Sequence, residues 1–219
     1  SVIKQIDGVT DGQARTALMG LDALADEYGA SVEEAPVTFG ACDNGALYEP
    51  STLQRLLEDG ADLVVWSIRG NTNARRRPQM FGWLRTEGNR IVAVSVKRPF
   101  DETLKDPVIL GTFTFRRAGD FRRCFDRMTA RGATVNGEYY LDTCIEDALA
   151  LGLRCVSMEV DAYLNWGTPD DLRTFEYWQS CFDKWASHPY RLEADTRVPA
   201  GEVAALRNRY APLVPQAPQ

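Results

Sequence analysis

Apolar residues are spaced in two alternating ways along most of the chain. Short apolar runs with the length and residue types of strands occur at 37–42, 62–68, 91–97, 108–115 and 155–160. Segments with apolar residues at helical spacing occur at 16–28, 51–57, 121–128 and 145–151. Because strands alternate with helices through the first half, this pattern predicts an α/β protein.

The predicted sheet is mixed. A turn at 87–89 joins the segment 81–84 to the strand 91–97 as an antiparallel hairpin. We therefore predict a three-layer fold with a mixed, mostly parallel sheet between helices. We expect residues 1–186 to form this domain and residues 187–219 to form a C-terminal extension, whose Pro-rich end is a linker or a disordered tail. An aromatic-rich helix from Arg173 onward is expected to pack on the domain or on an oligomeric partner.

The stretch from Pro36 to Tyr48 is the centre of the sequence argument. Its run 37–42 predicts a strand buried on both faces, which ends at a turn signal, Asp43–Asn44–Gly45. Open α/β sheets bind ligands at the carboxyl ends of their strands, which makes Asp43 a candidate binding residue. The alternative is that Asp43 only turns the chain or caps the next helix.

Composition excludes several classes of protein. The 219 residues carry a net charge of −6, which argues against nucleic acid or an acidic membrane as the main partner. No apolar run approaches the roughly 20 residues of a membrane span, and the first residues lack a signal-peptide pattern. The five cysteines form no CxxC pair, so neither a disulfide framework nor a zinc site is indicated, and a cytoplasmic protein with free thiols is expected. The single histidine, His188, is expected to be structural.

An arginine-rich loop interrupts this acidic composition. The segment 69–78 contains four arginines, Arg69, Arg75, Arg76 and Arg77, directly after a predicted strand. A charged run on a surface is often merely solvated. The other interpretation is a mobile clamp for phosphate, because the forked guanidinium group matches phosphate oxygens.

Seven short motifs occur in a recognisable order. They are TDGQA, CDN, FGW, VKRP, LGTFTF, NGEYYLD and NWGTPDDL, between Val9 and Trp178. In this order they resemble the sugar-phosphate nucleotidyltransferase family. The resemblance implies a Rossmann-like nucleotide-diphospho-sugar transferase fold. It also implies Mg²⁺-dependent transfer of a nucleoside monophosphate from a nucleoside triphosphate to a sugar phosphate or similar small phosphorylated acceptor, with release of pyrophosphate, as in sugar nucleotide biosynthesis.

The resemblance assigns roles on the nucleotide side. Gly12 and Gln13 match the loop that packs against the nucleobase. Asp43 matches the aspartate that holds Mg²⁺ beside the α-phosphate. Asn165 stands where many members have a second metal-binding aspartate, and some uridylyltransferases have asparagine there.

The resemblance also assigns roles on the acceptor side. Gly82 matches a glycine whose backbone meets the sugar, Lys97 matches the lysine that reaches the sugar phosphate, and Glu138 matches a glutamate that contacts the acceptor. Val96 replaces the glutamate that normally precedes the lysine, which leaves the identity of the acceptor open.

The family's opening strand and Gly-rich phosphate loop have no counterpart in the sequence. We expect the chain to be part of a longer protein that supplies this first βαβ unit, with a neighbouring domain or a second copy as possible further partners. The alternative is a degenerate, non-catalytic module that binds a nucleotide or acts as a scaffold. A dinucleotide-binding Rossmann enzyme ranks last, because the sequence lacks G-x-G-x-x-G.

Overall fold

The computed structural model describes residues 2–101 and 104–210. The chain divides into two compact units: unit 1 contains residues 1–42 and 46–163, and unit 2 contains residues 43–45 and 164–219. This division differs from the domain boundary at residue 186, which stays a prediction. The Pro-rich tail, which the sequence predicts to be a linker or a disordered end, lies outside the described residues.

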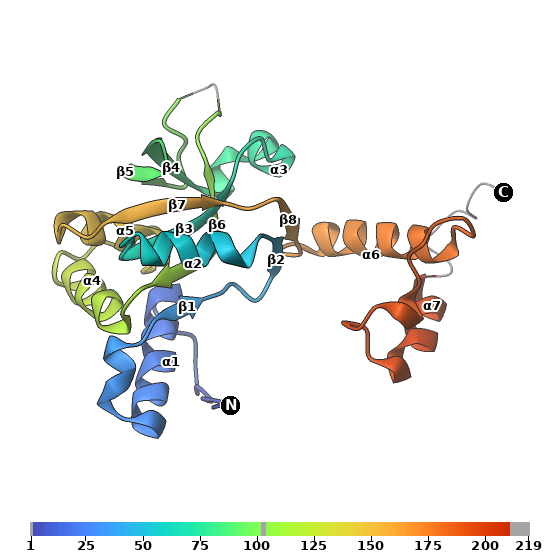
Figure 1. Ribbon diagram of the computed structural model, residues 1–219, viewed down its shortest axis with the longest axis horizontal. Coiled ribbons are helices and arrows are strands. Elements are labelled where there is room, and N and C mark those ends of the chain that lie inside the picture. Colours follow the sequence, from blue (N-terminus) through green and yellow to red (C-terminus); the bar gives the residue numbers. More distant parts are fainter. Residues whose placement is uncertain (1, 102–103, 211–219) are drawn as a thin grey trace. The chain divides into compact units, whose positions relative to one another are not determined.

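Unit 1 is built on a six-stranded sheet with the order β1-β6-β3-β7-β5-β4 (Figure 1). Its strands are β1 (Val37–Phe39), β3 (Leu63–Ile68), β4 (Gly82–Glu87), β5 (Arg90–Val96), β6 (Val108–Phe115) and β7 (Cys155–Glu159). A further pairing of Trp83 in β4 with Val108 in β6 makes β6, β3, β7, β5 and β4 a closed ring.

Helices cover both faces of this sheet (Figure 1). The helices of unit 1 are α1 (Gln13–Tyr28), α2 (Pro50–Glu58), α3 (Thr72–Arg76), α4 (Ala118–Ala130) and α5 (Leu141–Ala150), with short 3₁₀ turns η1 (Ala30–Glu34) and η2 (Pro78–Met80). Alternate residues of β3 point to opposite faces. Leu63 and Val65 join the core beneath α1, α4 and α5, whereas Val64 and Trp66 join the core beneath α2.

The α/β class is confirmed, but the mostly parallel sheet is wrong. Among the described residues, only β3 and β7 pair in parallel within the large sheet, and its other pairings are antiparallel. The cause is the position of β6. This strand runs antiparallel between β1 and β3, and the β4–β5 hairpin continues the sheet in the same antiparallel manner.

Several predicted elements agree with the structure and two do not. The strands at 62–68, 91–97, 108–115 and 155–160 match β3, β5, β6 and β7 to within one residue. The strand at 37–42 is only partly correct, since β1 ends at Phe39 and its residues are partly buried or exposed instead of buried on both faces. The arginine-rich segment is not only a loop, because it contains α3, which Asn71 caps by accepting from the Ala74 amide.

Unit 2 contains the long helix α6 (Pro169–Lys184), the helix α7 (Val203–Tyr210) and the 3₁₀ turns η3 (Leu192–Ala194) and η4 (Ala200–Glu202). Asp183 joins these elements: its carboxylate accepts from the Leu192 amide at 2.9 Å and from the Arg207 guanidinium at 3.0 Å. His188 stacks on Phe182 with ring centroids 4.6 Å apart, which agrees with a structural histidine.

Two short strands, β2 (Asn44–Leu47) and β8 (Ala162–Asn165), pair in a separate two-stranded sheet, and the division between the units passes through both of them. Within the described parts of both units, every helix is too short or too polar to cross a membrane.

Candidate functional site

Asp43 and Asn165 lie together in unit 2, beside Gly167. A Cβ added to Gly167 would lie 2.9 Å from Oδ2 of Asp43 and 3.2 Å from Oδ1 of Asn165. The two oxygens therefore border the same small space, which a side chain at residue 167 would fill. The backbone supports this arrangement, because the Trp166 amide donates to the Asp43 carbonyl at 2.8 Å.

The side-chain amide of Asn165 is oriented by its neighbours. Its Nδ2 donates to Oδ2 of Asp171 at 3.0 Å, and its Oδ1 accepts from the Gly167 amide at 3.0 Å. Asp171 is fixed in turn by Thr168, whose hydroxyl donates to it at 2.7 Å and accepts from its amide at 3.2 Å. Thr168 is the N-cap of α6, so the start of this helix holds the Asn165 oxygen toward the space shared with Asp43.

The donor set of this pair suits a hard cation. A carboxylate and an amide oxygen are ligands that Mg²⁺ accepts, and Mg²⁺ commonly takes only one or two protein side chains while keeping several waters. Among the described residues, no group of three or more His, Cys, Asp or Glu side chains could hold a metal ion. Asp43 and Asn165 could provide two protein ligands for Mg²⁺.

A second group of predicted residues lies together in unit 1. Gly82 begins β4, and a Cβ added to it would lie 2.1 Å from Oδ2 of Asp142 and 2.9 Å from Cδ1 of Ile109. Gly82 also pairs in register with Val96, the residue before Lys97. The carboxylate of Asp142 therefore packs directly against the Gly82 backbone, which explains why this position requires glycine.

Lys97 is held at the end of β5 by both its backbone and its side chain. It has a positive φ of 61°, which is uncommon for a residue with a side chain. Its amide donates to the Phe81 carbonyl at 3.1 Å, and its Nζ donates to the Met80 carbonyl at 2.9 Å. The ammonium lies 5.3 Å from the centroid of the Tyr140 ring. Backbone conformations of this kind often occur at functional sites.

Asp142 is an ionisable group with an altered proton affinity. Burial raises its pKa to about 6, although the positive charge of Lys97 and a backbone hydrogen bond act in the opposite direction. A carboxyl group with a pKa raised by burial beside a lysine is typical of functional sites.

The loop with Gly12 and Gln13 packs on the segment that carries Glu138. The Tyr139 amide donates to the Asp11 carbonyl at 2.8 Å, and the Ala14 amide donates to the Tyr139 carbonyl at 3.0 Å. A Cβ added to Gly12, whose φ is 128°, would lie 2.5 Å from the Tyr139 backbone. Gln13 and Glu138 are both exposed, so their side chains are accessible to a ligand.

Sequence reasoning missed two residues that support these groups, Asp142 and Asp171. Both lie inside motifs that the sequence analysis quotes, NGEYYLD and NWGTPDDL. The signal for Asp171 was its spacing from Thr168, which is that of a helix-capping pair. No comparable local signal marked Asp142, because its contact with Gly82 depends on the packing of α5 against the hairpin.

No protein-family model and no curated protein matches the sequence of this chain. Among solved structures, the chain is similar to the nucleoside-diphosphate-sugar pyrophosphorylase from Vibrio cholerae RC9, with 20% identity, a TM-score of 0.61 and coverage of 78% of this chain. It is also similar to the inositol-1-phosphate CTP transferase from T. maritima, with 15% identity, a TM-score of 0.48 and coverage of 73% of this chain and 57% of that one. The chain spans 66% of the length of the Vibrio cholerae protein. The likeness to that protein shows that the two share an α/β fold.

Proposed function

We propose that this protein is a nucleotidyltransferase. It transfers a nucleoside monophosphate from a nucleoside triphosphate to a sugar phosphate or a similar small phosphorylated acceptor and releases pyrophosphate. The order of the seven sequence motifs supports this proposal, as does the shared fold with a nucleoside-diphosphate-sugar pyrophosphorylase.

The observation that carries the proposal is the convergence of Asp43 and Asn165 on the space beside Gly167. These two side chains would hold Mg²⁺. When bound, the ion would supply positive charge that neutralises the negative charge of the α-phosphate. Asp171 keeps the Asn165 oxygen available for this role by holding the amide nitrogen.

The acceptor would be held by residues of unit 1. Lys97 would pair with the acceptor phosphate, and the Gly82 backbone and Glu138 would contact the rest of the acceptor. The reaction would be in-line attack of an acceptor phosphate oxygen on the α-phosphorus, which breaks the bond to pyrophosphate. A phosphate dianion is already a nucleophile, so positioning and charge neutralisation are the main tasks of the protein. The loop residues Gly12 and Gln13 would pack against the nucleobase.

Release of pyrophosphate from the complete protein tests this proposal. Nucleoside triphosphates are incubated with phosphorylated acceptors, with Mg²⁺ or with a chelator, and pyrophosphate is measured. Asp43→Ala is expected to lower turnover by at least about a hundredfold, because it removes the charged metal ligand. Asp170→Ala is the matched control, because this carboxylate is exposed near the start of α6 and forms an ion pair with the exposed Arg173. Equal activity of Asp43→Ala and wild type would remove Asp43 from the mechanism.

Substitution of Lys97 tests the acceptor side separately. Lys97→Ala is expected to raise the KM for the acceptor about tenfold or more, with a much smaller change in the KM for the triphosphate, because a charge-assisted contact to one substrate is lost. An unchanged acceptor KM and kcat would contradict the role of Lys97. If the wild-type protein binds a nucleotide but releases no pyrophosphate with any pair, the non-catalytic module is the better description.

A further inference from the structure

Two connections leave the same end of the sheet in unit 1 and pack against each other. The connection 69–81 follows β3, and the second connection, described at 97–101 and 104–107, follows β5. Ile68 and Trp83, which flank the first connection, both pair with Val108, which follows the second. The two connections share a small apolar cluster made of Ala74, Phe81, Trp83, Phe100, Leu104 and Val108. Figure 1 shows α3 beside these connections.

Four arginines lie on the two connections, and backbone contacts link their segments to Lys97. Arg75, Arg76 and Arg77 directly follow Ala74, which is 1% exposed and anchors α3 in the apolar cluster. The Met80 amide donates to the Arg77 carbonyl at 3.0 Å, and the Met80 carbonyl accepts from Nζ of Lys97. Arg98 follows Lys97 in the chain, in the connection that carries Phe100.

Among the described residues, the side chains of Arg75, Arg76, Arg77 and Arg98 have no hydrogen bond, ion pair or ring contact. We call these four residues the arginine cluster. Exposure alone does not prevent an arginine from pairing. Arg173 and Arg197 have side chains that are 72% and 76% exposed, yet both form ion pairs with aspartates. Nor is the protein short of carboxylates, since it has 31 acidic residues against 25 basic ones.

Three acidic residues that the structure describes in or next to these connections pair with other arginines. Asp101 and Asp106, in the connection with Arg98, both pair with Arg85 at 3.8 Å. Glu159, at the end of β7, pairs with Arg69 at 3.5 Å. The arginine cluster therefore keeps its positive charge for a partner outside the described chain. Guanidinium groups bind carboxylates and phosphates through two parallel hydrogen bonds, so the chemistry of that partner is anionic.

We propose that the arginine cluster binds a second anionic group of the acceptor, a carboxylate or a further phosphate, in addition to the phosphate at Lys97. The substrate class is therefore a phosphorylated acid or a bisphosphorylated compound, not a neutral sugar monophosphate. This inference rests on the proposed function, because it takes the bound molecule to be the acceptor. The anion site itself is argued from the packing and charges of unit 1.

The test compares two probes that differ in one group. Binding of 3-phosphoglycerate, which has a phosphate and a carboxylate, and of glycerol 3-phosphate, which has only the phosphate, is measured by titration calorimetry with the complete protein. Wild type is expected to bind 3-phosphoglycerate about tenfold more tightly, because one charge-assisted pair is added. The triple variant R75S/R76S/R77S is expected to bind both probes equally. Its affinity for glycerol 3-phosphate should match that of wild type, whereas Lys97→Ala should weaken both probes.

A second triple variant controls for net charge. R55S/R90S/R173S removes the same three charges from exposed arginines outside the cluster, and it is expected to keep the preference for 3-phosphoglycerate. The proposal is overturned if wild type shows no preference, if it binds neither probe at millimolar concentrations, or if R75S/R76S/R77S keeps the preference. Failure of the proposed function would be seen differently: the preference between the probes would remain, but no triphosphate would yield pyrophosphate.

Discussion

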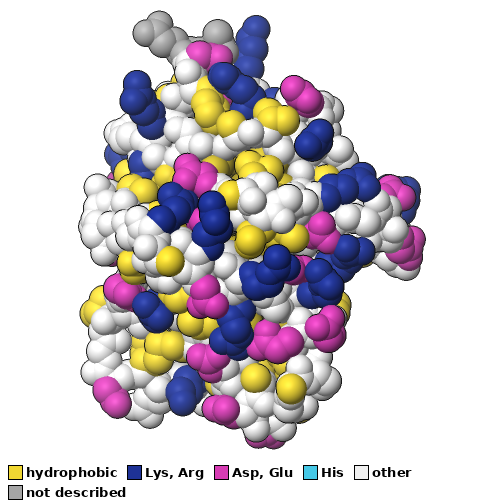
Figure 2. Space-filling model, turned by 90° about the vertical axis from the view of Figure 1, so that its left-hand side faces the viewer, with side chains coloured by type: hydrophobic (Ala, Val, Ile, Leu, Met, Phe, Trp, Pro, Cys, Tyr) yellow, Lys and Arg dark blue, Asp and Glu magenta, His cyan; other side chains and the backbone are white. Residues whose placement is uncertain are grey.

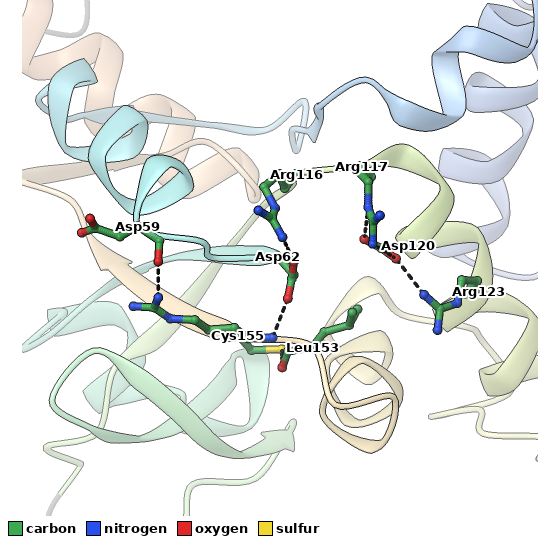
Figure 3. Close-up of polar contacts among 9 residues, drawn as sticks. Asp59, Asp62, Arg116, Arg117, Asp120, Arg123, Leu153 and Cys155 are labelled. Atoms are coloured by element: carbon green, nitrogen blue, oxygen red, sulfur yellow. Dashed lines mark hydrogen bonds and ion pairs between the residues drawn. The ribbon is translucent and has the colours of Figure 1, made fainter.

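The two ends of β3 carry arginines with opposite surroundings. At the start of the strand, Asp62 accepts from the Arg154 amide at 2.9 Å and forms an ion pair with Arg116 (Figure 3). Next to it, Asp120 pairs with Arg117 and Arg123 at 3.0 Å, although its side chain is only 2% exposed (Figure 3). At the other end of the strand, the arginine cluster has no such partners within the described residues.

This contrast separates arginines that hold the fold together from arginines available to a ligand. Asp62 precedes β3, Arg116 follows β6 and Arg154 precedes β7. The contacts of Asp62 therefore hold the ends of these three neighbouring strands together. Over the face shown in Figure 2, basic side chains are similarly interleaved with acidic ones. The arginine cluster departs from this pattern, which is why we assign it to binding and the Asp62 end to stability.

The largest effect on stability is expected at Asp120. Asp120→Ala would remove the charge-assisted hydrogen bonds to Arg117 and Arg123, and the free energy of unfolding is expected to fall by about 2 kcal/mol, because both arginines stay exposed to water. Chemical denaturation measures this change. Asp126→Ala, an exposed carboxylate on the same helix α4, is the control and should change stability very little. Equal stability of the two variants would contradict a structural role for the paired end.

A smaller loss is expected at Asp62, with a dependence on pH. Burial alone would raise the pKa of Asp62, but the Arg154 amide and the Arg116 guanidinium outweigh it and leave the pKa below its usual value of 3.8. A lowered pKa in the folded state means that the stabilisation is present above pH 3.8 and disappears as the pH falls further. Asp62→Asn should cost about 1.5 kcal/mol at neutral pH, and its deficit should shrink in acid. A deficit that stays constant down to pH 3 would disprove this account.

Asp142 is expected to show the reverse pH dependence. Its folded-state pKa of about 6 lies above its usual value of 3.8, so the folded protein binds more protons than the unfolded one between these values. The free energy of unfolding should therefore decrease as the pH rises from 4 toward 6. Asp142→Asn should flatten this decrease. Urea denaturation across the range tests it, and a decrease of the same size in the variant would assign the effect to other groups.

The smallest effect on stability is expected at the arginine cluster. R75S/R76S/R77S removes exposed side chains that form no hydrogen bond, ion pair or ring contact among the described residues, so the free energy of unfolding should change by less than about 0.5 kcal/mol. Thermal and chemical denaturation beside Asp120→Ala would show the contrast directly. A loss comparable to that of Asp120→Ala would mean that these arginines are structural after all.

Much of the sheet could be predicted because its strands carry strong local signals. Val108–Phe115 is almost continuously apolar and matches β6, since this strand is covered on both faces. β2 and β8 have four residues each and are only partly buried at most positions, so no apolar run marks them. The parallel or antiparallel direction of a strand leaves no local trace in its residues. For this reason the mostly parallel sheet could not be corrected from the sequence.

The candidate site could be predicted only in part for a related reason. The motifs drew attention to Asp43 and Asn165 separately, and the pairing of β2 with β8 brings them together. The supporting roles of Asp142 and Asp171 depend on how helices begin and pack. The arginine cluster lacks ion-pair partners within the described residues because nearby aspartates pair with Arg85 instead. The spacing of residues in the sequence does not show which arginine pairs with which carboxylate.

The measurement that tests the central claim most directly is the fate of the phosphates of a labelled triphosphate. The complete protein is incubated with Mg²⁺, a phosphorylated acceptor and a nucleoside triphosphate labelled at either the α- or the γ-phosphate. Nucleotidyl transfer predicts that the α-label moves into the acceptor product and the γ-label appears in pyrophosphate, and that Asp43→Ala stops both. Transfer of the γ-label to the acceptor, or no transfer of either label, would contradict the account.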